Sequence, residues 1–110
     1  MRIPALAMLL TLLAACGGAL AEGRSEFNKG RYPEAKQTLA SLESDSRAWN
    51  DAKRAEYALY RGLTLAALGD RAEADVWLRE AKAIEDVHPG SLSREDGHRL
   101  KVGLDTGDAR

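Results

Sequence analysis

Cysteine, histidine and aromatic residues are scarce in this chain. It has one cysteine, Cys16, two histidines, His88 and His98, and 5% aromatic residues. A single cysteine forms no internal disulfide. The histidines stand ten positions apart with no cysteine near them, so the usual spacing of metal ligands is missing. We therefore expect no structural disulfide, no metal site and no other cofactor.

The chain also lacks an excess of either charge. Lys and Arg number 16 and Asp and Glu number 17, which leaves a net charge of −1. Nucleic-acid binding needs a clustered positive surface, so we expect no nucleic-acid partner. No phosphate-binding glycine loop and no nucleophile elbow occurs, and the acidic pairs at 85–86 and 95–96 fit solvated helix ends. We expect neither an enzyme nor a small-molecule substrate.

No apolar run is long enough to cross a bilayer. The longest covers the 13 residues 3–15, IPALAMLLTLLAA, whereas a transmembrane helix needs about 20. Arg2 precedes this run and small residues end it, which is typical of a secretory signal peptide. One interpretation is an ordinary signal that is cut near the alanines, with Cys16 there by coincidence.

A sharper interpretation comes from residues 13–16, which read Leu-Ala-Ala-Cys and resemble the bacterial lipoprotein box. The resemblance implies that 1–15 is a signal peptide and that Cys16 carries a diacylglyceryl group through its sulfur. Residues 16–21 would then be a lipidated tether, because several acyl chains together anchor a protein stably. Gly17 stands where an aspartate would favour the inner membrane, so the resemblance implies the periplasmic side of the outer membrane.

The rest of the chain contains an internal repeat. Its composition favours helices, because alanine, leucine, glutamate and arginine dominate. In each copy one glycine allows a close helix crossing, a second glycine ends that helix, and an alanine and a leucine of the next helix face the same core. Two helix–turn–helix units are therefore predicted. The copies are offset by 39 residues and pair Gly23 with Gly62, Gly30 with Gly69, Glu34 with Glu73, Ala35 with Ala74, and Leu39 with Leu78.

This pattern resembles the tetratricopeptide repeat, best at Gly62, Gly69, Ala74, Leu78 and Ala81. The resemblance implies an all-α fold, an antiparallel helix stack of about two repeats plus a C-terminal helix. The large residues usual in the first helix are absent. The period is 39 rather than 34, so about five residues are inserted, and we place them in 44–51.

These patterns also predict where the domain begins and ends. We expect a helical domain over 22–104 and a flexible tail over 105–110. Ser93 can cap the last helix, and Gly103 follows Gly69 by 34 residues, so this helix would be a truncated third repeat. So short an array predicts modest stability, assisted by a partner or by self-association.

The resemblance implies that a partner binds the concave face, which the first helix of each repeat lines. A second candidate set rests on residue type, because tyrosine and arginine are enriched at binding hot spots, although tyrosines at helical spacing also pack. The first set is Arg24, Phe27, Asn28, Glu56, Leu59, Leu63 and Ala67, and the second is Tyr57, Tyr60 and Arg61.

Together these features predict a membrane-anchored lipoprotein of the bacterial cell envelope. Its expected function is protein–protein interaction or assembly support, with an envelope protein whose identity the sequence does not reveal. The alternative is a glycan- or cell-wall-associated lipoprotein that stacks a sugar on Trp49. Trp77 has helical spacing with its apolar neighbours, so we expect it to pack in the core.

Overall fold

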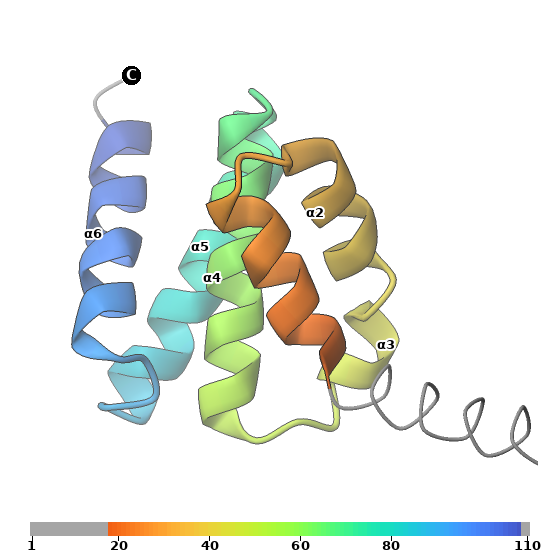
Figure 1. Cartoon of the computed structure of the whole chain (residues 1–110). Coiled ribbons are helices and arrows are strands. Elements are labelled where there is room, and N and C mark those ends of the chain that lie inside the picture. The colour runs from red at the N-terminus through yellow and green to blue at the C-terminus, as the bar shows by residue number, and fades with distance from the viewer. Residues whose placement is uncertain (1–17, 109–110) are drawn as a thin grey trace, which may run out of the picture.

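The computed structural model describes residues 18–108, and these form a stack of helices with no strand among them (Figure 1). The predicted all-α helix stack is confirmed. The signal peptide and Cys16 lie outside the described residues. The helices are a first one over residues 18–28, α2 (Tyr32–Ala40), α3 (Glu43–Ser46), α4 (Asp51–Ala67), α5 (Arg71–Val87) and α6 (Arg94–Asp108).

Helix α4 is the centre of the stack and contacts α2, α3, α5 and α6. In Figure 1 the helix over 18–28 and α2 lie on one side of α4, α6 lies on the other, and α5 lies behind. The long helices alternate in direction because their connections are short. The expected burial of α4 on several sides is confirmed by Ala55, Tyr57, Ala58, Leu59, Tyr60 and Leu65, which are all almost inaccessible to solvent.

Side-chain caps begin three of the helices. Asn50 accepts a hydrogen bond from the Lys53 backbone N–H at 2.9 Å, and Ser93 accepts one from the Asp96 N–H at 3.1 Å. The predicted cap at Asp70 is present as a longer contact of 3.4 Å from the Glu73 N–H. These side chains satisfy backbone donors that have no partner within the helix, so they define where each helix starts.

The repeat predicted from the sequence is present as a structural repeat. A Cβ atom on Gly23 would lie 2.6 Å from Leu39 Cδ2, and one on Gly62 would lie 2.7 Å from Leu78 Cδ2. Each glycine therefore lets its helix approach the next one more closely than a side chain would permit. Ala35 and Ala74, which precede these leucines in the two copies, are fully buried.

The turns of the two hairpins also repeat. Gly30 and Gly69 have φ of 77° and 86°, which is the left-handed conformation that glycine adopts without strain. The backbone N–H of Arg31 donates to the Glu26 carbonyl at 2.8 Å, and Asp70 donates to Leu65 at 2.9 Å. Both contacts belong to the Schellman motif that ends a helix.

Two boundary predictions differ from the structure. Helical structure is present from residue 18, where we expected a tether up to 21, and Leu20 is part of the core. The flexible tail over 105–110 is wrong for 105–108, because α6 continues to Asp108. Its last turns pack on α5, where the Arg71 side chain donates to the Gly103 carbonyl at 2.6 Å.

Two local features were also unforeseen. Gly103 does not repeat the turn at Gly69. It lies inside α6, and a Cβ there would be 3.3 Å from both Leu63 and Leu78. The segment 44–51, which we expected to be an inserted connection, contains most of the short helix α3.

Gly62→Ala should lower the free energy of unfolding by about 1–3 kcal/mol, because the new methyl group overlaps Leu78 and lies 3.1 Å from the Ala74 carbonyl oxygen. Gly97→Ala is the matched control in α6. A Cβ there meets nothing within 4 Å, so the better helix propensity of alanine should raise stability by about 0.5–1 kcal/mol. Urea unfolding followed by circular dichroism measures both, and equal effects would contradict the close contact at Gly62.

Candidate interaction groove

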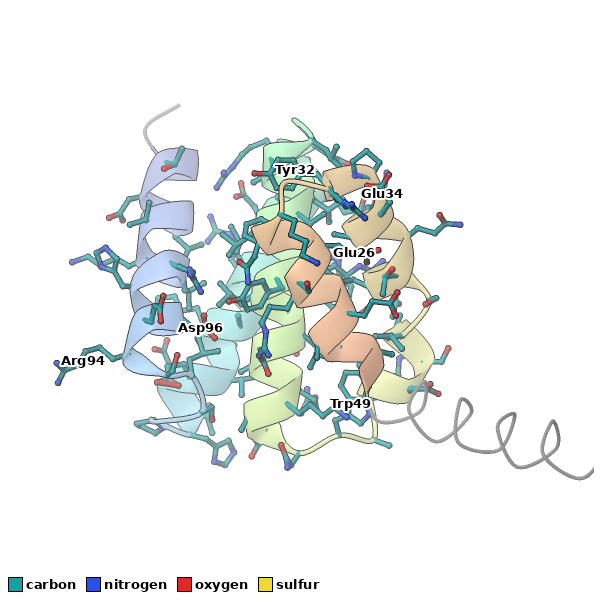
Figure 2. The ribbon with its side chains drawn as sticks, viewed as in Figure 1. Glu26, Tyr32, Glu34, Trp49, Arg94 and Asp96 are labelled. Atoms are coloured by element: carbon teal, nitrogen blue, oxygen red, sulfur yellow. The ribbon has the colours of Figure 1, made fainter. Side chains whose placement is uncertain are left out.

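A groove opens where the helix over 18–28, the first half of α4 and the start of α6 meet. We call it the interaction groove, and its volume is about 470 Å³. Figure 2 shows Asp96 on the side of α6 that faces α4, whereas Arg94 points away from the stack. The groove is lined by Arg24, Asn50, Ala52, Lys53, Glu56, Ser91, Leu92, Ser93 and Asp96.

Charges of both signs line this groove. Arg24 and Glu56 form an ion pair across two helices, and their side chains remain 42% and 23% exposed. A pair this exposed stabilises a fold by only about 0–1 kcal/mol. Lys53 lies 4.1 Å from the centre of the Trp49 ring. The main effect of these residues is to present an alternating pattern of cations and carboxylates.

Tyr60 holds one wall of the groove in place. Its hydroxyl donates to Asp96 Oδ1 at 2.9 Å and accepts from the Arg99 guanidinium at 2.7 Å. Burial, followed by the hydrogen bond to the Asp96 carboxylate, raises the pKa of Tyr60 to about 12. The contact ties the first turns of α6 to the middle of α4.

The loop between α5 and α6 forms the lower edge of the groove. Both oxygens of Glu85 accept backbone hydrogen bonds from it, from Gly90 N–H at 3.0 Å and from Leu92 N–H at 3.1 Å. Gly90 has φ of 92°. Glu85 is therefore bound to the loop and is not the solvated helix end that the sequence suggested. The same correction applies to Asp96.

The structure brings together only part of the predicted partner surface. Arg24 and Glu56 line the interaction groove. Phe27 is half-buried, with its ring 5.6 Å from that of Tyr60, and Asn28 is exposed at the end of the same helix. Ala67 is exposed at the far end of α4.

Other predicted partner residues are part of the core. Leu59 is wrong as a binding residue, because it has no exposed surface. Tyr57 and Tyr60 are each 1% exposed, so the packing alternative is correct for both. Leu63 is half-buried and faces Gly103 of α6.

Arg61 is also structural, since its side chain is 11% exposed and donates to Glu43 Oε1 at 2.6 Å. This hydrogen bond and the positive charge of Arg61 lower the pKa of Glu43. Arg61 donates as well to the Tyr57 hydroxyl at 2.9 Å, and that hydroxyl donates to the Leu39 carbonyl at 2.6 Å. These contacts join α2 and α3 to α4.

Both tryptophans pack against Tyr57. The Tyr57 ring lies 5.6 Å from that of Trp49 and 5.7 Å from that of Trp77, in edge-on geometry. The Arg61 guanidinium lies 4.3 Å from the Trp77 ring, which fits the packing role expected for Trp77. Trp49 is half-buried and sits near the start of the helix over 18–28 (Figure 2).

Sequence reasoning missed Lys53, Asp96 and the segment 91–93 as groove residues. Asp96 could have been found from the aligned repeat, because its helix follows the α5 hairpin as α4 follows the first one. The two histidines lie on the surface, with His88 Nε2 3.2 Å from Asp51. Within residues 18–108 no group of three or more possible metal ligands occurs, and none of the helices is long and apolar enough to span a membrane.

Compared with known proteins, the chain matches no protein family, no curated protein and no solved structure. Its function is therefore argued from its own residues and from the geometry of the groove.

Tyr60→Phe tests how α6 is held. It removes two hydrogen bonds, so the free energy of unfolding should fall by about 1–2 kcal/mol at neutral pH. In the parent chain, stability should decline as the pH rises above about 10, because an unfolded tyrosine ionises there while folded Tyr60 keeps its proton to about pH 12.

The variant should show a shallower alkaline decline. Tyr32→Phe, on the other side of α4, is the matched control and should keep the parent slope. Urea titrations between neutral and alkaline pH measure both quantities. An unchanged slope in Tyr60→Phe would contradict the assigned contact.

Proposed function

We propose that this chain is a lipid-anchored protein of the bacterial cell envelope that binds a partner protein through the interaction groove. The observation that carries the proposal is the set of exposed charges at the junction of three helices: Arg24 paired with Glu56, and Lys53 and Asp96 beside them. The tetratricopeptide-like repeat supports it, because the groove lies on the face formed by the helix over 18–28, α4 and α6.

A protein segment fits this groove better than a small molecule does. The groove is open, and its charged groups are spread along three helices rather than converging on one point. Cations and carboxylates in alternation favour a polypeptide that offers both signs of charge, and they determine specificity and association rate more than affinity. The apolar wall at Phe27 supplies contact area at one end.

The lipoprotein box supports anchoring at the N-terminus. Only Gly17 separates Cys16 from the helix that begins by residue 18, and an extended residue spans at most about 3.6 Å. Lipid on Cys16 would therefore keep the stack close to the bilayer surface. Tethering of this kind raises the effective concentration of an envelope partner without adding a contact.

The groove is tested by exchanging its charges. Glu56→Arg should reduce in-cell crosslinking to the main partner about tenfold, because it places two cations side by side and reverses the pattern. Arg24→Glu combined with Glu56→Arg restores the ion pair and should fold normally, yet still lose the partner. Lys36→Glu on the exposed surface of α2 is the control. Mass spectrometry of the crosslinked material measures recovery, and unchanged recovery in the double variant would refute the groove.

The anchor is tested separately. Cys16→Ala should abolish labelling by a fatty-acid analogue and move the protein from the membrane fraction to the soluble fraction. Ser41→Ala is the control, because its exposed hydroxyl bonds only within its own turn. A Cys16→Ala variant that stays membrane-bound, from a parent chain that takes up no label, would refute lipidation.

Glycan binding is the second candidate, and partial exposure of Trp49 beside Lys53 is the observation that favours it. Lys53 already covers the ring and would have to move away before a sugar could stack. Sedimentation with purified cell wall that is lost in Trp49→Phe would support this candidate over the protein partner.

A further inference from the structure

A second groove lies between α5 and α6, away from the interaction groove. We call it the terminal groove, and its volume is about 300 Å³. Leu100 and Leu104 form its apolar part, together with Gly97, whose Cβ position is open space. The rim carries Arg79, Lys82, Lys101 and Asp105.

The repeat indicates what shape belongs there. The helix over 18–28 is covered by α2, and α4 is covered by α5, in each case with a leucine against a glycine. Helix α6 packs on α5 and α4, and among residues 18–108 no helix lies on its outer side (Figure 1). Gly97, Leu100 and Leu104 fall three and four positions apart, so they form one stripe along α6. Such a stripe suits a further helix.

The charges of the rim indicate what sequence that helix has. Three cations face one carboxylate, Asp105. Lys82 also bonds Asp86 at 2.6 Å, but both side chains are more than half exposed, so this pair contributes little and can exchange. A helix with acidic residues beside its apolar stripe complements this rim.

We infer that the terminal groove receives an acidic amphipathic helix of the partner protein, which continues the stack beyond α6. The inference rests on the proposed function, since it assigns that same partner a second contact. The chain contains a helix of the required kind. Residues 70–87, which include α5, have six acidic and three basic residues and bury Ala74, Leu78 and Ala81 against α4.

The probe is a fluorescent synthetic peptide of residues 70–87, titrated into the purified full chain in detergent. Saturable binding is expected, with anisotropy as the readout. Gly97→Leu fills the groove without a clash and should weaken binding about tenfold, whereas Gly97→Ala should bind more tightly than Gly97→Leu. Lys101→Glu should also weaken binding, and so should a peptide with glutamine in place of its glutamates.

Several results would overturn the inference. One is no saturable binding, and another is equal binding by the parent and Gly97→Leu, which would mean that the peptide displaces α5. A dimer that Gly97→Leu dissociates in sedimentation equilibrium would assign the groove to a second copy. Glu56→Arg separates the two proposals, because it should lose the cellular partner yet bind the peptide normally. Normal peptide binding with no partner in the parent chain would refute only the proposed function.

Discussion

The backbone of α4 approaches α5 at Gly62 so closely that Leu78 occupies the space of a missing side chain. The same contact joins the helix over 18–28 to α2 through Gly23 and Leu39. Each hairpin is therefore fixed by a leucine packed on a bare helix backbone, where dispersion contacts are dense and a methyl group is felt. The spacing and tilt of the remaining helices follow from these two contacts, because α4 takes part in the stack on both sides.

Two tyrosines of α4 then attach the rest of the chain. Tyr57 reaches back to the end of α2 through the Leu39 carbonyl, and Tyr60 reaches forward to Asp96 of α6. Each hydroxyl also accepts from an arginine, Arg61 or Arg99, so neither buried oxygen is left with unused capacity. The interaction groove exists because Tyr60 holds α6 at a distance from the helix over 18–28 while the floor remains α4.

The two grooves differ in character, and this difference suggests a division of labour. The interaction groove is polar, with cations and carboxylates in similar number, and it suits recognition of a particular polypeptide. The terminal groove has a leucine stripe and a mostly cationic rim, and it suits a packed helix. A partner that uses both would cover α6 from two sides. In a chain with two hairpins and one closing helix, such coverage would add stability that longer arrays obtain from their own repeats.

The sequence by itself determined the all-helical stack, the two hairpins, their glycine contacts and turns, and the caps at Asp70 and Ser93, because these depend on local spacing and on residues that few alternatives replace. It did not determine which α4 residues face solvent. Tyr57, Tyr60 and Leu59 read as surface candidates, yet they are buried because α2, α3 and α6 pack around α4 from distant parts of the chain. Asp96 and Glu85 read as solvated charges for the same reason, since their partners lie across a helix contact or a loop. Only tertiary packing decides such contacts, because it brings together groups whose separation along the chain carries no periodic signal.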